Sequence, residues 1–192
     1  RVCAWSVRNL SLSLTYDYRC RYYCGLTSVT VPLAISHING DVSLSRRSME
    51  AKKKAEAEKA MVEGAKCLKT STFGRWKPDY EAAAAEYEKA ATAFRLAKAL
   101  PSAIEALTKA SAMHEQFDSG YMAAKHVETA AFLAGAGGLK DPAKSADLYE
   151  KGAALHQVDG RLENASEALG KAARVLEGVD NKRAGEIGVA AC

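Results

Sequence analysis

The sequence predicts an all-α protein, a solenoid in which antiparallel helix hairpins stack on one another, with a poorly structured N-terminal segment in front. Three observations lead to this fold class. From Met49 onward, residues of high helix propensity (Ala, Glu, Lys and Leu) dominate the chain. Pro, Gly and Asp interrupt these runs about every 20 residues. A short motif recurs at the same interval, which is typical of a repeat architecture.

Residues 1–48 differ from the rest of the chain and form the first predicted region. They hold six Arg and two Asp and show no helical period. Their longest apolar-leaning run, residues 29–38, is far shorter than the roughly 20 residues that span a bilayer. Two interpretations remain open: a non-native sequence upstream of a true start at Met49, or an Arg-bearing, Ser-rich targeting peptide. In either case we expect an unstructured segment over residues 1–48, followed by the helical domain, residues 49–192.

Charge and cysteine content limit the classes of partner. The net charge of +4 arises within residues 1–48, because residues 49–192 hold 21 basic and 21 acidic side chains. The helical region therefore offers no electrostatic reason to expect a nucleic-acid partner. Five cysteines, an odd number without dense spacing, indicate reduced thiols in a cytosolic setting.

The helices of residues 49–192 are expected to begin and end at local signals. The first covers Glu50 to Leu68, and the last begins at Asn181 and reaches Glu186 before small residues follow. Pro at the first helical position loses no hydrogen bond, and Asp141 just before Pro142 can cap the free amides of the next turn. The interruptions are Lys77-Pro78, Leu100-Pro101, Asp118-Ser119-Gly120, Asp141-Pro142 and Asp159-Gly160.

One motif recurs in five of the predicted helices, with a polar centre at steps of 20, 20, 22 and 20 residues. Apolar residues lie two positions before this centre and two and four positions after it. The residue directly after the centre is always Ala or Gly, which lets neighbouring helices approach closely. The polar centres are Lys89, Lys109, Thr129, Lys151 and Lys171, and the small residues are Ala90, Ala110, Ala130, Gly152 and Ala172.

This period predicts the architecture. One helix per step makes a helix pair of about 40 residues, longer than the roughly 34 of a tetratricopeptide unit. We therefore expect a tetratricopeptide-like α-solenoid of antiparallel helix hairpins. A plain helical bundle is the alternative, whereas a coiled coil is disfavoured because no heptad register is sustained.

Two blocks carry a family resemblance: "LKT…F…WKPDY" from Leu68, and "EYEKAATAF" from Glu86. Over about Met49 to Asp180 the chain resembles the gamma form of the soluble NSF attachment proteins (SNAPs). The resemblance implies a non-enzymatic adaptor of vesicle trafficking, cytoplasmic and peripheral on membranes. Such adaptors bind the SNARE four-helix bundle (syntaxin-type) and recruit the NSF ATPase. It also implies that the C-terminal half of these proteins, which activates the ATPase, has no counterpart here.

The resemblance further implies a membrane-contact loop between the first two helices. In related proteins this loop carries exposed apolar side chains that dip into the membrane, and basic neighbours would favour anionic head groups. As an alternative, Trp76 folds back onto the next helix near Tyr80. The membrane-contact residues are Phe73, Gly74 and Trp76, with the basic flank Lys69, Arg75 and Lys77.

The implied SNARE-binding residues are basic side chains that meet an acidic helical bundle. The alternative for each is an ordinary solvated lysine, and the alternative for the whole chain is a generic tetratricopeptide-like peptide-binding scaffold or cochaperone. The candidates are Lys89, Lys109, Lys125, Lys151 and Lys171, with Arg95 in support.

The sequence indicates no catalytic residue, metal site or cofactor. His114 begins "HEQFD", which lacks the second His of a zinc-protease helix, and Gly135 to Gly138 do not complete a dinucleotide-binding motif. His114 and His156 share a position in the repeat, so we expect them to fill equivalent packing sites.

Overall fold

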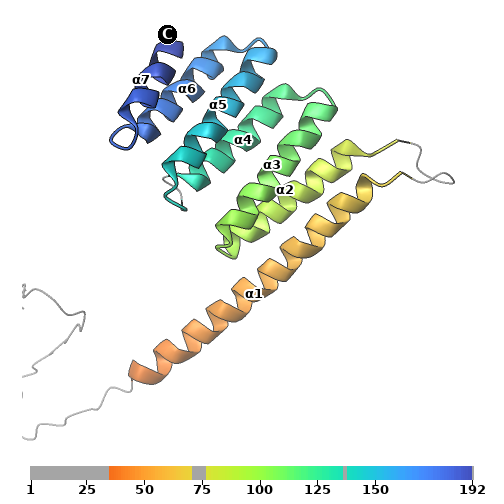
Figure 1. Cartoon of the computed structure of the whole chain (residues 1–192). Coiled ribbons are helices and arrows are strands. Elements are labelled where there is room, and N and C mark those ends of the chain that lie inside the picture. The colour runs from red at the N-terminus through yellow and green to blue at the C-terminus, as the bar shows by residue number, and fades with distance from the viewer. Residues whose placement is uncertain (1–34, 71–76, 136–137, 192) are drawn as a thin grey trace, which may run out of the picture. The chain divides into compact units, whose positions relative to one another are not determined.

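The computed structural model describes residues 35–70, 77–135 and 138–191, with side chains from residue 45 onward. Apart from Ile35 at the start of the first helix, its helices lie in one unit, Ser36–Cys192. Seven α-helices and no strand occur within these ranges (Figure 1), which confirms the predicted all-α class. The helices are α1 (Ile35–Cys67), α2 (Tyr80–Leu96), α3 (Leu100–Gln116), α4 (Gly120–Ala134), α5 (Pro142–Val158), α6 (Leu162–Leu176) and α7 (Asn181–Ala190).

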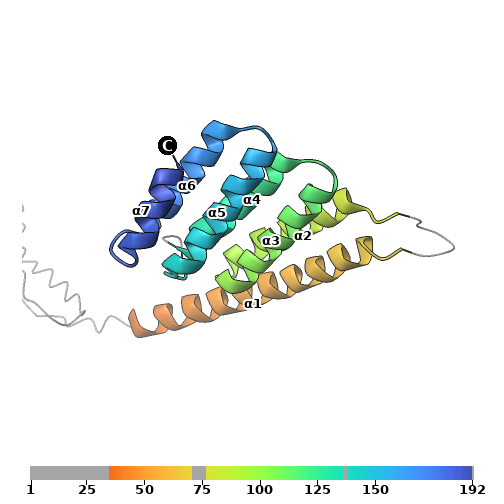
Figure 2. The same cartoon turned by 45° about the horizontal axis from the view of Figure 1, so that its top comes forward.

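From α2 to α7, each helix packs on the helix that follows it in sequence. Figures 1 and 2 show the result as a row of helical hairpins placed side by side. Contact mainly between sequence neighbours is typical of a solenoid, in which each repeat touches only the next one. The predicted solenoid is therefore confirmed.

Local signals start several helices where the sequence predicts them. Asp79, Asp141 and Asp180 precede α2, α5 and α7, and each side chain accepts a hydrogen bond from the backbone amide three residues later, at 3.0–3.1 Å. These bonds satisfy one of the free amides at each helix start. Among the described residues, each connection from α2 to α7 also has a residue with positive φ: Lys98, Asp118, Lys140, Gly160 and Gly178.

Helix α1 begins upstream of Met49, which corrects the expectation of an unstructured segment over residues 35–48. These residues contain no Pro, and extending an existing helix costs far less than nucleating one. The Ser48 hydroxyl donates to the Ser45 carbonyl at 2.9 Å, so a polar side chain is accommodated within the helix. Residues 45–48 are exposed, and residues 1–34 lie outside the described residues.

The core depends on small side chains, as predicted. Ala90, Ala110, Ala130, Gly152 and Ala172, which follow the polar centres of the repeat, are all buried. Larger side chains fill the remaining space: Phe94, Ile104 and Leu107 in a cluster that joins α1 to α4, and Tyr149, Leu176 and Ile187 in a cluster that joins α4 to α7.

Gly64 on α1 faces the Tyr87 ring of α2. A Cβ atom at Gly64 would lie 3.0 Å from this ring, so a larger residue there would require the Tyr87 side chain to shift by a few tenths of an ångström.

Candidate functional site

Polar contacts join helices that are two apart in the sequence. They define an even layer (α2, α4 and α6) and an odd layer (α3, α5 and α7). The even layer contains Glu88–His126 at 2.9 Å and Glu128–Lys171 at 3.0 Å. The odd layer contains Glu115–Lys151 at 3.6 Å, and Arg183 with Asp147 at 2.5 Å and with Glu150 at 2.8 Å.

Two clusters of ionisable side chains occupy corresponding places in successive hairpins. The first cluster is Glu88, His114 and His126, and the second cluster is Glu128, His156 and Lys171. In each, a carboxylate of the even layer meets the Nε2 atom of a histidine on the following helix. The Oε1–Nε2 distance is 2.8 Å for Glu88 and His114 and 2.9 Å for Glu128 and His156.

Both histidines lie in the interior, where their side chains are 9% and 3% exposed. The prediction that His114 and His156 fill equivalent packing sites is therefore confirmed. Each contacts an acid and also lies near an aromatic ring, that of Phe117 for His114 and that of Tyr121 for His156. The repeat spacing alone does not identify the acids, although Glu88 and Glu128 both directly precede a polar centre of the repeat.

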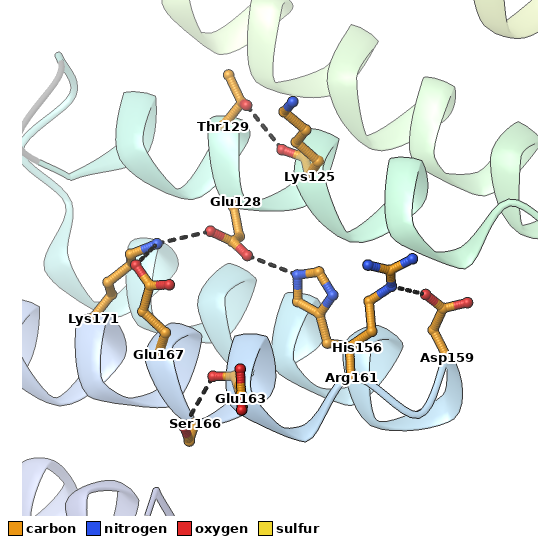
Figure 3. A network of polar contacts seen from close by, with 10 residues as sticks. All are labelled: Lys125, Glu128, Thr129, His156, Asp159, Arg161, Glu163, Ser166, Glu167 and Lys171. Carbon is orange, nitrogen blue, oxygen red and sulfur yellow. Dashed lines mark hydrogen bonds and ion pairs between the residues drawn. The ribbon is translucent and has the colours of Figure 1, made fainter.

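In the second cluster, the third member is a lysine (Figure 3). The Nζ atom of Lys171 lies 3.0 Å from Glu128 and 3.0 Å from Glu167. Burial opposes the lysine charge, but hydrogen bonds to Glu167 and Glu128 outweigh it and raise the pKa of Lys171. Gly152 leaves room for this arrangement, since a Cβ atom there would lie 3.3 Å from the Glu128 Cγ atom.

In the first cluster, the third member is His126 on α4. Its ring stacks on the His114 ring with centroids 4.9 Å apart and an interplanar angle of 19°. Burial lowers the pKa of His126, and the nearby Glu88 carboxylate only partly offsets this effect. The third member is thus a lysine ammonium in the second cluster and an imidazole in the first cluster.

The predicted SNARE-binding lysines divide between the two layers. Lys89, Lys125 and Lys171 lie in the even layer, and Lys109 and Lys151 lie in the odd layer. The structure therefore does not bring all five to one layer.

Most of these lysines already have partners. Lys89 pairs with Glu86 at 2.5 Å, and Lys109 pairs with Glu105 at 2.7 Å. The Nζ atom of Lys125 lies 5.8 Å from the centre of the Tyr121 ring. The Lys89 side chain is 67% exposed, whereas that of Lys171 is only 33% exposed. Lys89 is therefore far more accessible to a partner than Lys171.

The predicted membrane-contact loop joins α1 to α2. Its central residues Phe73, Gly74, Arg75 and Trp76 lie outside the described residues. Lys69 and Lys77, on either side, are exposed. Within the described ranges, no helix combines the length and apolar character needed to cross a membrane.

Comparison with known proteins identifies relatives of this chain. The family model described as "Soluble NSF attachment protein, SNAP" matches residues 48–187. A gamma-soluble NSF attachment protein of Dictyostelium discoideum is 39% identical over 132 residues, covering 69% of this chain and 40% of the relative. One of Arabidopsis thaliana is 39% identical over 138 residues, covering 72% of this chain and 46% of the relative. The chain thus spans less than half the length of these curated relatives.

Proposed function

Because the chain belongs to the soluble NSF attachment protein family, we propose that it is an adaptor of vesicle trafficking. It binds the assembled SNARE four-helix bundle, of syntaxin type, and takes part in recruiting the NSF ATPase. The observation that carries this proposal is the family match over residues 48–187, which includes all of α2 to α6. The hairpin stack supports it, because a row of repeats offers an extended surface to an elongated partner.

Basic residues of the even layer are the candidates we favour for the SNARE contact. Lys89, Arg95 and Lys125 are exposed and come from helices α2 and α4, which polar contacts join within one layer. Lys171 is a weaker candidate, because two carboxylates already neutralise its charge. Basic side chains facing an acidic bundle would speed encounter and set the register of binding.

Co-precipitation with an assembled SNARE complex tests the proposal. We expect the full chain to bind at about 50 mM salt and the bound fraction to fall several-fold at about 300 mM, because salt screens charge contacts. Unassembled SNARE proteins are the control and should bind less. Failure to bind the assembled bundle would contradict the proposal, and salt-independent binding to extended peptides would instead favour the peptide-binding scaffold.

We also propose that the α1–α2 loop touches a membrane surface. Burying one aromatic side chain at a bilayer interface contributes about 1.5–3 kcal/mol, enough to orient a protein that a partner already holds. We expect Phe73→Ser together with Trp76→Ser to lower the fraction of chain that floats with vesicles containing anionic lipid at least about three-fold.

Phe132→Ser is the matched control, because Phe132 on α4 is 54% exposed and lies outside the loop. It should leave flotation unchanged. Equal loss in the loop variant and in the Phe132 variant would contradict a specific role for the loop.

A further inference from the structure

We propose that Glu88, His114 and His126 form a binding site for a divalent transition-metal ion of the zinc class. The site joins three helices, since the residues come from α2, α3 and α4 respectively. It therefore bridges two successive hairpins of the stack.

The first support is the geometry of the donor atoms. Each residue offers one ligand atom, and the three atoms lie within 4.8 Å of one another. The Glu88 Oε1 atom is 2.8 Å from the His114 Nε2 atom and 2.9 Å from the His126 Nε2 atom. Zinc ligands at about 2.0–2.2 Å in a tetrahedral site are about 3.3 Å apart, so the two distances from Glu88 Oε1 to the histidine nitrogens need to lengthen by roughly half an ångström. The Glu88 side chain is 38% exposed and has room for this adjustment.

The second support is an unsatisfied donor–acceptor group. The His126 Nε2 atom is buried and has no hydrogen-bond partner, although it lies 2.9 Å from Glu88 Oε1. The contact is close but not aligned as a hydrogen bond. A buried polar atom without a partner costs free energy, and coordination to a metal ion would satisfy it.

The third support is comparison with the second cluster. There, the Glu128 carboxylate on α4 forms an ion pair with Lys171 on α6, the helix two after α4. The helix two after Glu88 supplies His126 instead, and every ion pair of Glu88 among the described residues involves a histidine. A divalent cation would give Glu88 the positive charge that Lys171 gives Glu128.

The donor set selects the class of ion. Two imidazole nitrogens with one carboxylate suit Zn²⁺ and similar transition metals, whereas Ca²⁺ and Mg²⁺ prefer oxygen ligands throughout. Three protein ligands leave a fourth position for water. We expect the ion to hold the two hairpins together and to raise the thermal unfolding midpoint, because it binds the folded state.

The test is titration of the metal-free full chain with Co²⁺ and then Zn²⁺, with visible absorption and chelator competition as readouts. The expected result is one ion per chain. The bound Co²⁺ should show the absorption spectrum typical of nitrogen and oxygen ligands, without a thiolate charge-transfer band. Glu88→Gln and His126→Gln should each weaken binding at least about 100-fold, since loss of an outer-shell partner alone costs about 10–100-fold. Circular dichroism checks that each variant is folded.

Glu128→Gln is the matched control, because it alters the same type of acid–histidine contact in the second cluster. It should change the metal affinity by less than about two-fold. Absence of stoichiometric binding would overturn the proposal. So would unchanged affinity in both folded variants of the first cluster, which would place the ion on other groups such as the five cysteines.

Discussion

Replacing Ala90 with leucine is expected to lower the free energy of unfolding by about 3 kcal/mol. Ala90 is fully buried in the cluster that joins α1 to α4, where Ala57 and Phe94 also lie. Leucine adds three carbon atoms where the helices meet at close distance, so either the side chains leave their preferred rotamers or the helices separate. Urea denaturation followed by circular dichroism measures the loss.

Ala85→Leu on the same helix provides the control. Alanine and leucine both favour helix, and Ala85 is exposed, so this change should alter stability by less than about 0.5 kcal/mol. Similar losses in the Ala85 and Ala90 variants would contradict the view that small buried residues set the spacing of the stack.

Replacing Glu128 with alanine is expected to lower the free energy of unfolding by about 2–3 kcal/mol. The Glu128 carboxylate contacts His156 on α5 and Lys171 on α6, and its side chain is only 22% exposed. Its loss leaves partly buried polar groups on two neighbouring helices without this partner (Figure 3). Thermal and urea denaturation both measure the effect.

Glu167→Ala separates this network effect from the simple loss of an ion pair. Glu167 also pairs with Lys171 at 3.0 Å, but its side chain is 64% exposed. An exposed pair of this kind contributes about 0.3–0.5 kcal/mol. If Glu167→Ala proved as destabilising as Glu128→Ala, the position of Glu128 between three helices would have no special importance.

The parts of the fold that depend on local chemistry could be predicted from the sequence. Asp141 followed by Pro142 starts α5 because a capping carboxylate and a fixed φ act within one turn. The buried series that includes Ala90 and Gly152 was visible because repeated packing demands small residues at a regular interval. The family was recognisable from the block that surrounds the α1–α2 loop, and the family match confirms it.

The polar contacts between helices could not be predicted. The repeated motif gives each polar centre the same position on its own helix, but antiparallel hairpins place successive helices in alternate layers. Lys89 and Lys109 therefore separate, although their local sequences match. Glu88 meets His114 and His126 only after three helices have packed, so neither cluster could be found by spacing alone.

The upstream start of α1 was missed for a different reason. Residues 35–48 contain Ser, Val and Asn, which have modest helix propensity, so no local signal marked them as helical. Their helical state follows from the strong helix that comes directly after them. Helix α7 similarly extends to Ala190, beyond the expected Glu186.

The proposed SNARE contact of the even layer is tested by the affinity of the full chain for an assembled SNARE bundle, measured for two charge-reversed double variants. Lys89→Glu with Lys125→Glu alters the even layer, and Lys109→Glu with Lys151→Glu alters the odd layer by the same net charge. We predict that the even-layer variant binds at least about ten-fold more weakly, a loss of about 1.4 kcal/mol, and that the odd-layer variant stays within about three-fold of the unaltered chain. Equal weakening in both variants, or none in the even-layer variant, would contradict it.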